Sequence, residues 1–370
     1  MRILHVLTSL GMGGAEKLSL ALCERMTERG HTVSLLVLMP PVNEEWPANV
    51  QRLYLDVVAS PRSFLRGLLR ARRFAADFQP DLIHSHSFHA NMLARLLRLL
   101  LPRPIVISTV HNVYEGGRWR MIAYRLTDCL SRRTVAVSRA AAQRFVELSA
   151  VPARKCSLIV NGIDTGEFAP DAHRREPICT ESALDSAPGS FLWLAAGRIA
   201  PAKDYPNLLR AFVLVRAARP DAQLWIAGES AGTDLHPLQS LASELRLDGS
   251  VRWLGLRRDM PALLDVADAF VSASAWEGMP LAVGEAMAME KPVVATDVGG
   301  VRELVGNAAS IVLSRNPDAL ATAMLEMMQQ SREARRALGR KARRRIVEQF
   351  SMDANADRWQ ALYKDLLAQR

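Results

Sequence analysis

The feature of this 370-residue chain that most constrains its fold is a series of short apolar runs separated by longer segments with helical periodicity. Each run is nearly continuous, which is typical of a strand covered on both faces of a parallel sheet. Strands of this kind alternating with helices predict the α/β fold class. The expected strands are residues 2–7, 32–38, 81–86, 104–109 and 133–138 in the first half, and 191–197, 222–228, 251–255, 269–274, 292–297 and 309–313 in the second.

A polar stretch with three prolines separates the two sets of runs and has the composition of a linker. The chain is also longer than one ordinary core requires. We therefore predict two doubly wound parallel-sheet domains, over residues 1–168 and 190–350, joined by a linker over residues 169–189. In such sheets ligands bind beyond the carboxyl ends of the strands, so both domains are expected to direct their functional loops into a shared cleft.

The loop after the first expected strand, GMGGAEK at residues 11–17, is rich in glycine and opens a helix. It departs from the dinucleotide fingerprint because Glu16 replaces the third glycine and because the second expected strand ends without an acidic residue for a ribose. These departures argue against a nicotinamide cofactor. Gly13 and Gly14 would still allow backbone N–H groups to approach a phosphate or a sugar, with a simple strand-to-helix turn as the alternative explanation.

The stretch WEGMPLAVGEAMA, residues 276–288, places two glutamates in an apolar setting. Pro280 suits the first turn of a helix, which puts Glu277 and Gly278 in the preceding loop and Glu285 about two turns inside. The backbone of residues 279–282 would then present its N–H groups to a phosphate at the positive end of the helix dipole. Carboxylates accept hydrogen bonds from hydroxyls, so a diphosphate with a sugar at each end would satisfy both glutamates. That ligand is a sugar nucleotide.

Its two phosphates require cations. Arg198 and Lys203 follow the first expected strand of the second domain and lie at the same strand edge as the glutamates. Considered singly, either residue would more simply be a surface charge. Together, and next to Gly197, they are candidates to hold the diphosphate. The sequence contains no Asp-x-Asp, the usual motif for holding a divalent cation in the other nucleotide-sugar fold, so no metal is expected.

These motifs resemble family 4 of the retaining glycosyltransferases. The second half has "GR" with a lysine five residues after the arginine, then "WLG", "EGMPLAVGEAMA" and "PVVATDVGGVREL". The first half has "GGAE", "DLIHSH", "STVHN", "AVS" and "VNGID". The resemblance covers nearly the entire chain and implies a GT-B fold, with the acceptor bound mainly by the first domain and the donor by the second. It also implies that a C-terminal helix, residues 351–370, packs back on the first domain; the apolar stripe Trp359, Leu362, Tyr363, Leu366 and Leu367 supports this.

The resemblance implies a role for each candidate residue. Glu285 is expected to hold the ribose, Glu277 the hydroxyls of the transferred sugar, and Arg198 and Lys203 the departing phosphate. His111 is expected at the reacting face of the sugar. The remaining donor contacts are assigned to Gly14, Gly278, Met279, Pro280, Leu281 and Ala282, and the acceptor-side contacts to Gly13 and Glu16. Retention without an obvious protein nucleophile implies same-face attack, with no cofactor and with a UDP-sugar favoured over a GDP-sugar.

Other interpretations stay open at this point. His84, His86 and His89 could indicate a metal, although "DLIHSH" fits the family's strand-end pattern instead. A related phosphorylase would need pyridoxal phosphate on a lysine. A protein that binds sugar nucleotides without catalysis is a further alternative, and intact Arg198, Lys203 and Glu277 argue against it. The acceptor is expected to be lipid-linked or a polysaccharide in bacterial cell-surface glycan assembly, with a soluble small molecule as the alternative.

The net positive charge lies in the first half. Residues 1–168 contain 22 Lys and Arg against 13 Asp and Glu, so the formal excess of +9 lies there. Leucine and arginine alternate at helical spacing in residues 63–74 and 91–101, which suits helices lying on anionic lipid. The alternative is an ordinary core-facing helix with a solvated basic back, and nucleic acid is not expected as a partner. Widely spaced cysteines and the lack of a spanning segment predict a cytoplasmic protein, with peripheral attachment to the inner face of the membrane as an extension.

Overall fold

The computed structural model describes all residues except 12, 41–49, 59, 172–189, 230–233 and 370. The chain forms two compact units, Met1–Gly162 together with Met352–Arg370, and Ile163–Ser351. The division falls a few residues before the boundary expected at residue 168, so residues 163–168 belong to the second unit. Most of the expected linker, residues 169–189, lies outside the described residues.

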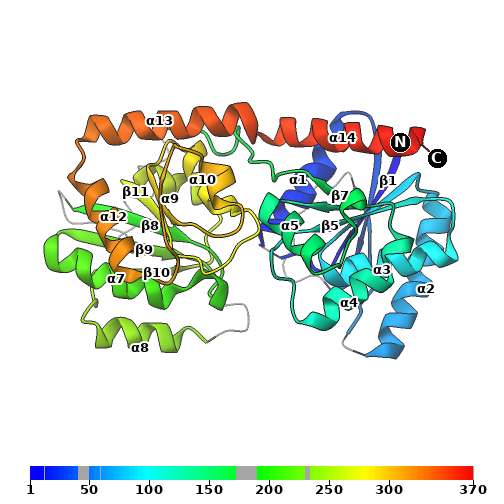
Figure 1. Ribbon diagram of the computed structural model, residues 1–370, viewed down its shortest axis with the longest axis horizontal. Coiled ribbons are helices and arrows are strands. Elements are labelled where there is room, and N and C mark those ends of the chain that lie inside the picture. The colour runs from blue at the N-terminus through cyan, green and yellow to red at the C-terminus, as the bar shows by residue number, and fades with distance from the viewer. Residues whose placement is uncertain (12, 41–49, 59, 172–189, 230–233, 370) are drawn as a thin grey trace. The chain divides into compact units, whose positions relative to one another are not determined.

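The first unit is built on a parallel sheet (Figure 1). The sheet has seven strands in the order β3-β2-β1-β4-β5-β6-β7. Neighbouring strands are all parallel. The chain starts at the centre of the sheet and moves outward in both directions, as in a doubly wound fold. The strands are β1 Arg2–Leu7, β2 Thr32–Val37, β3 Gln51–Tyr54, β4 Leu82–His86, β5 Ile105–Val110, β6 Arg133–Ala136 and β7 Cys156–Leu158.

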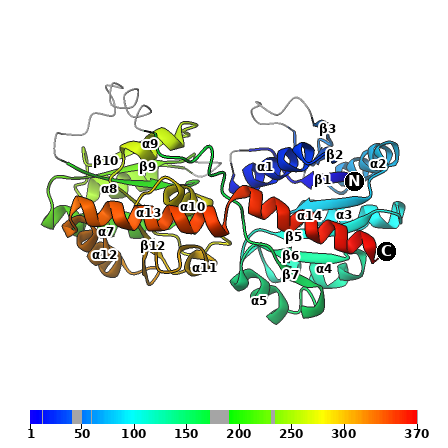
Figure 2. The ribbon, with the colours of Figure 1, turned by 90° about the horizontal axis from the view of Figure 1, so that it is seen from above.

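Helices cover both faces of this sheet. Alternate residues of β1 face opposite sides: Leu4 and Val6 join the apolar cluster under α2 and α3, whereas His5 faces the side of α14. Helix α14 lies beside α1 (Figure 2) and buries Trp359, Tyr363 and Leu366. The helices are α1 Gly14–Glu28, α2 Pro61–Phe78, α3 Phe88–Leu100, α4 Arg118–Leu126, α5 Arg139–Glu147 and α14 Met352–Ala368.

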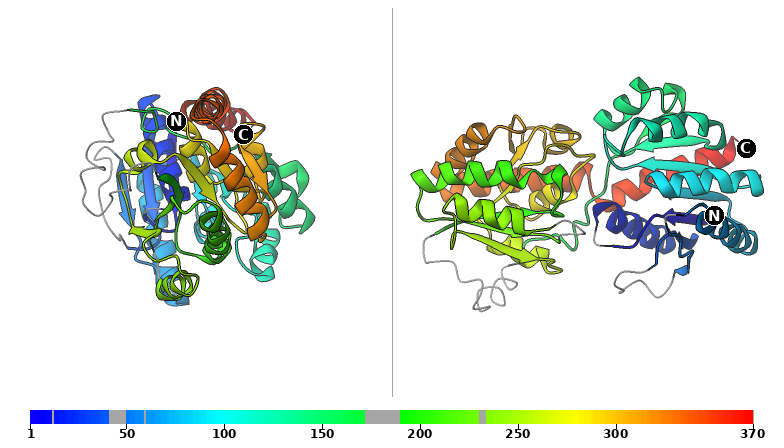
Figure 3. Two further views of the ribbon diagram at one scale, coloured as in Figure 1. Left: turned by 90° about the vertical axis from the view of Figure 1, so that its left-hand side faces the viewer. Right: turned by 90° about the horizontal axis from the view of Figure 1, so that it is seen from below.

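The second unit repeats the plan with a six-stranded parallel sheet in the order β10-β9-β8-β11-β12-β13. Its helices cover both faces (Figure 3), with α7 packed on α8 and α12, and α10 packed on α11 and α13. The strands are β8 Phe191–Ala196, β9 Ala222–Ala227, β10 Val251–Gly255, β11 Ala269–Ser272, β12 Val293–Thr296 and β13 Ser310–Val312. The helices are α7 Tyr205–Ala218, α8 His236–Glu244, α9 Met260–Val266, α10 Leu281–Ala288, α11 Val301–Val305, α12 Pro317–Gln329 and α13 Arg332–Gln349.

The structure confirms every strand expected from the apolar runs and the two-sheet α/β fold. It adds β3 and β7, which the sequence did not predict. Both are edge strands of the first sheet, and their residues are half-buried or exposed. A strand with one neighbour and partial solvent contact does not need a continuous apolar run, so it carries no such signal.

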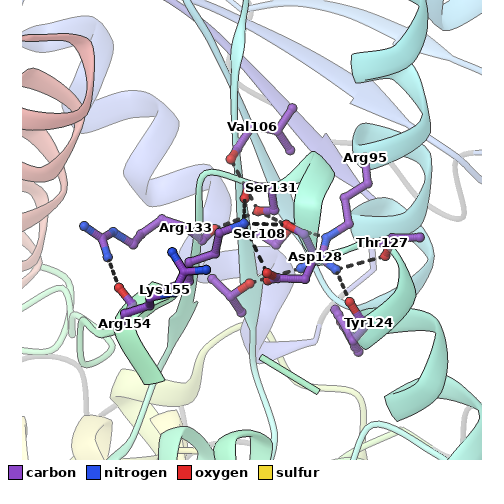
Figure 4. A network of polar contacts seen from close by, with 11 residues as sticks. Arg95, Val106, Ser108, Tyr124, Thr127, Asp128, Ser131, Arg133, Arg154 and Lys155 are labelled. Carbon is purple, nitrogen blue, oxygen red and sulfur yellow. Dashed lines mark hydrogen bonds and ion pairs between the residues drawn. The ribbon is translucent and has the colours of Figure 1, made fainter. Parts of the chain in front are cut away.

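Residues 91–101 follow the alternative interpretation of their leucine–arginine pattern, a core-facing helix, except that one of its arginines is buried and not solvated. Arg95 of α3 is fully buried and donates to the hydroxyls of Ser108, Thr127 and Thr134 and to the carbonyl of Tyr124, over 2.9–3.1 Å (Figure 4). Arg98 donates to the carbonyls of two nearby prolines. Most of α3 therefore faces the core, and its exposed leucines, Leu99 and Leu100, lie at its C-terminal end.

The same region contains a buried carboxyl group. Glu115 accepts hydrogen bonds from the Tyr124 hydroxyl at 2.6 Å and from the backbone N–H of His111 at 3.1 Å. Asn91 in turn donates to the Tyr124 hydroxyl at 2.8 Å. Burial outweighs these hydrogen bonds and raises the pKa of Glu115 from 4.5 to about 7. The folded protein therefore holds this proton more tightly than the unfolded chain does.

This pKa shift predicts a pH-dependent effect of Glu115→Gln. Between pH 4.5 and 7 the unfolded chain loses the proton first, so the wild type loses up to roughly 3 kcal/mol of stability as pH rises through this window. Glutamine resembles the protonated acid and avoids that loss. We expect the variant to melt at a higher temperature than the wild type at pH 8 and at a similar temperature at pH 4.5. An equal difference in melting temperature at both pH values would show that Glu115 is not protonated on folding.

Candidate active site

In the second unit, the loop after β8 is held close to the loop after β9. Gly197 has a φ of +150°, and a Cβ at Gly228 would lie 1.9 Å from the Gly197 carbonyl oxygen. The Tyr205 hydroxyl donates to the same carbonyl at 2.7 Å. A Cβ at Gly197 itself would meet the Lys203 side chain at 2.6 Å. Glycine is therefore required at both positions, and the loop places Lys203 against the strand ends.

Lys203 forms an ion pair with Glu277, which follows β11. The Lys203 ammonium donates to Glu277 Oε1 at 2.6 Å, and the Ser274 hydroxyl donates to the same oxygen at 2.8 Å. Only 9% of Glu277 is exposed, so its carboxylate needs such partners. The two residues that the sequence assigned to phosphate and to sugar thus lie in direct contact in the protein alone.

The backbone at Glu277 is fixed by the loop after β12. Gly299 has a φ of +55°, and a Cβ there would lie 2.0 Å from the Glu277 carbonyl oxygen. The next residue, Gly300, donates its N–H to the carbonyl of Gly278 at 2.8 Å. The hydroxyl of Thr296 donates to the Ser274 carbonyl at 2.6 Å. Neighbouring strand ends therefore hold the glutamate loop in one conformation.

Helix α10 begins one residue later than expected. Pro280 precedes the first helical residue, Leu281, so Glu285 is the fifth residue of the helix and lies about one turn inside rather than two. Glu285 is half-buried, whereas Met279 and Pro280 are buried. The amides of Leu281 and Ala282 come before the first hydrogen bond of the helix, from Gly284 to the Pro280 carbonyl, and so face the positive end of the dipole.

Arg198 lies in the same loop as Lys203 but differs from it. Its side chain is exposed, and among the described residues it forms no ion pair or hydrogen bond. The second unit thus brings together one solvated arginine, one lysine shared with a carboxylate, and a helix N-terminus. This combination can bind an anion of high charge next to a group with hydroxyls.

In the first unit, strand alternation gathers histidines on one face of the sheet. His5 pairs in register with His84, and Leu7 pairs with His86. His84 is hydrogen-bonded to the Tyr363 hydroxyl at 2.6 Å and to the Thr109 hydroxyl at 2.7 Å. His86 is hydrogen-bonded to His5 at 3.2 Å and to His111 at 3.1 Å.

His111 directly follows β5 and is half-buried, whereas the other three of these histidines are buried. Burial lowers its pKa from 6.5 to about 4, so the imidazole is neutral at pH 7. Burial lowers the pKa of His5 to about 3 in the same way. A neutral His111 offers a ligand one hydrogen-bond donor or one acceptor, not a positive charge.

Three of the four histidines are close enough to be considered as metal ligands. Nitrogens of His5, His84 and His86 lie within 4.8 Å of one another. Hydrogen bonds engage both nitrogens of His84 and both of His86, so a metal would have to displace these partners. His89, which the sequence grouped with His84 and His86, is exposed on α3 and is not one of the three.

The glycine-rich loop places an acidic group at the start of α1. Gly14 is the first helical residue, and a Cβ at Gly13 would lie 2.2 Å from Glu16 Oε2. The Ser9 hydroxyl donates to the other carboxylate oxygen of Glu16 at 3.0 Å. The carboxylate thus lies at the N-terminus of its own helix. There it stabilises the helix through the dipole and disfavours binding of a phosphate, which is also negative. A sugar hydroxyl suits this position better.

Several residues of these networks were missed from the sequence, among them Ser274, Tyr205, Glu115 and His5. Ser274 stands three residues before Glu277 at a strand end, and that spacing was the only available signal. Tyr205 and Glu115 carried no such signal. Their hydrogen-bond partners Gly197, Tyr124 and His111 are near in the chain, but the contacts depend on loop courses that are set by packing, so local sequence could not identify them.

Two family models match the chain. One, described as Glycosyltransferase Family 4, matches residues 12–167; the other, described as Glycosyl transferases group 1, matches residues 181–345. Among similar proteins, the UDP-Gal:alpha-D-GlcNAc-diphosphoundecaprenol alpha-1,3-galactosyltransferase of Escherichia coli is 22% identical over 100% of this chain and 98% of its own length. A D-inositol 3-phosphate glycosyltransferase of Segniliparus rotundus is 28% identical over 82% of this chain and 70% of its own.

Solved structures with low sequence identity share the fold. Sucrose-phosphate synthase from Thermosynechococcus elongatus is 19% identical, with a TM-score of 0.87 over 100% of both chains. HepE from Anabaena, solved in complex with UDP and glucose, is 18% identical, with a TM-score of 0.85 over 99% of this chain and 100% of its own. One family model falls on each unit, and together they span most of the chain. The chain therefore belongs to the family 4 glycosyltransferases and has the GT-B fold.

Proposed function

We propose that this glycosyltransferase moves a sugar from a nucleotide-diphosphate sugar, with retention of configuration and without a metal ion, to a lipid-linked or polysaccharide acceptor in bacterial cell-surface glycan assembly. The observation that carries the proposal is the Lys203–Glu277 pair near the N-terminus of α10, with the exposed Arg198 in the same loop as Lys203. It supplies cationic groups for a diphosphate and a carboxylate for a sugar within one rigid set of strand-end loops.

Donor binding would redistribute the hydrogen bonds of this pair. Lys203 has three N–H donors, so it can keep Glu277 and also donate to a phosphate oxygen. As the bond to the sugar breaks, negative charge grows on the departing phosphate, and the hydrogen bonds from Lys203 and Arg198 strengthen with it. Glu277 would accept from sugar hydroxyls, and Glu285 from the ribose. No protein group here is required as a nucleophile.

The relatives support the choice of substrates. The name of the Escherichia coli relative gives UDP-galactose as donor and a diphosphoundecaprenol-linked sugar as acceptor. HepE was solved with UDP and glucose. A UDP-sugar and a lipid-linked acceptor are therefore the substrates that we propose for this chain. A soluble small-molecule acceptor is the second candidate, supported by the inositol phosphate named for the Segniliparus relative.

The surface of the first unit supports peripheral attachment to anionic lipid. Helix α2 exposes Leu65 and Leu69 among arginines, and α4 exposes Trp119, Ile122 and Leu126, which lie on one helical face. Arg118 and Arg125 of α4 are exposed beside them. Apolar side chains flanked by arginine suit the boundary between headgroups and acyl chains. Within the described residues, no helix has the length and hydropathy needed to cross a bilayer.

The proposed cation pair predicts that activity does not need a divalent metal. Because Arg198 and Lys203 neutralise the diphosphate, the rate of sugar transfer should be unchanged after dialysis against excess EDTA. Lys203→Ala should instead reduce kcat by about a hundredfold or more, and added Mg²⁺ should not rescue it. Loss of wild-type activity in EDTA with recovery in Mn²⁺ or Mg²⁺ would contradict the proposal.

The two glutamates are predicted to affect different steps. Glu285→Ala should weaken binding of free UDP by roughly tenfold, because the ribose contact is made before and during transfer alike. Glu277→Gln should lower kcat by about a hundredfold and change UDP affinity little. Titration calorimetry and steady-state kinetics on both variants measure the two effects. The opposite pattern would exchange the roles assigned to these residues.

Membrane attachment is tested by flotation with vesicles. The wild type should float with vesicles that contain anionic lipid, and less so as salt rises, since screening weakens the arginine contacts. Replacing Trp119 and Ile122 of α4 by serine should reduce vesicle binding by about tenfold or more, because each substitution removes apolar surface that would be buried in the bilayer. Leu313→Ser is the matched control, since Leu313 is 71% exposed on the second unit. Equal flotation of the three proteins would exclude α4 as the attachment surface.

A further inference from the structure

Three neutral imidazoles in the first unit form one hydrogen-bonded row. His5 Nδ1 meets His86 Nε2 at 3.2 Å, and His86 Nδ1 meets His111 Nε2 at 3.1 Å. His5 and His86 are buried, whereas His111 ends the row at the partly exposed strand edge. Each neutral imidazole has one donor nitrogen and one acceptor nitrogen, so the tautomers of the three rings are linked.

The row can have either of two polarities. In the first, all three rings carry hydrogen on Nδ1, so His5 donates to His86 and His86 donates to His111. In the second, all three carry it on Nε2, and every hydrogen bond runs in the opposite direction. The two states differ at the ends of the row: at Nε2 of His5 inside the core, and at Nδ1 of His111 at the strand edge.

The surroundings of the inner end, Nε2 of His5, favour one of these two states. Nε2 of His5 is buried and has no hydrogen-bond partner among the described residues. In the second polarity this nitrogen would carry a buried N–H without an acceptor, which folded proteins rarely tolerate. In the first polarity it is only an acceptor without a donor. The first polarity therefore has the lower cost, and it leaves the Nδ1–H of His111 at the outer end.

We propose that His86 is a positioning residue that donates to His111 and thereby fixes His111 as a hydrogen-bond donor through Nδ1. This inference rests on the proposed function and on the expectation, implied by the family resemblance, that His111 lies at the reacting face of the donor sugar. An outward N–H can bind a sugar or phosphate oxygen but cannot remove the acceptor's proton. The acceptor's proton must then go elsewhere, which agrees with its transfer to the departing phosphate.

The groups around the row do not alter this assignment. His84 packs on His86, with ring centroids 4.1 Å apart, but its own nitrogens are bonded to Tyr363 and Thr109. Glu115 contacts His111 through the backbone N–H and not through the ring. The donor state of His111 therefore depends on His86 and, through it, on His5.

The tautomers can be read directly by long-range ¹H–¹⁵N NMR on the full chain labelled in histidine, without any substrate. We expect the Nδ1–H pattern for His5, His86 and His111, with assignments made from single histidine variants. An Nε2–H pattern at His111 would overturn the proposal. Because this measurement needs no catalysis, it distinguishes failure of the inference from failure of the proposed function.

A matched pair of variants tests the consequence for activity. In His86→Asn the amide can replace the Nδ1–H donor, whereas the carboxylate of His86→Asp can only accept and would force His111 into the Nε2–H state. We expect kcat of His86→Asn within about threefold of the wild type, and kcat of His86→Asp at least tenfold lower with similar KM. His84→Asn is the control for loss of a buried histidine on the same strand, with the His111 tautomer retained. Equal losses in the Asn and Asp variants at position 86, with both folded, would contradict a donor role for His86.

Discussion

The parallel arrangement of both sheets is the constraint on which the candidate site depends. Parallel strands all end at the same edge, so residues far apart in the chain meet there once the sheet forms. In the second unit this edge joins the loops of β8, β11 and β12, which carry Lys203, Glu277 and Gly299. In the first unit it places His86 beside His111. The chemistry of each unit follows from this shared edge.

Burial determines how the charges at these edges are used. Glu277 is nearly buried and is stabilised by a lysine and a serine hydroxyl. Arg198, which we propose as a partner of the diphosphate, is exposed to solvent. Arg95 differs from both, because its guanidinium is fully buried and donates to three neutral hydroxyls and a carbonyl. Arg198 thus stays accessible to solvent, whereas the buried Arg95 is compensated by four hydrogen bonds.

In the first unit, buried histidines are hydrogen-bonded to the half-buried His111 at the strand edge. Strand alternation and parallel register bring His5, His84 and His86 to one face, and α14 covers them with Trp359 and Tyr363. Burial keeps these imidazoles neutral, so they act through the direction of their hydrogen bonds rather than through charge. The unpaired nitrogen of His5 then influences the only histidine of the row that is accessible to a ligand.

The sequence by itself determined the α/β class, the two sheets, the inner strands and the residues at the strand ends, because continuous apolar runs and glycine-rich turns are local signals. It did not reveal the edge strands β3 and β7, whose partial exposure removes that signal. Leucine and arginine alternate at helical spacing in both α2 and α3, yet only the tertiary structure shows that Leu65 is exposed and Arg95 is buried. The Lys203–Glu277 pair and the His5–His86–His111 row were likewise decided by tertiary structure, because their members meet only when distant segments pack together.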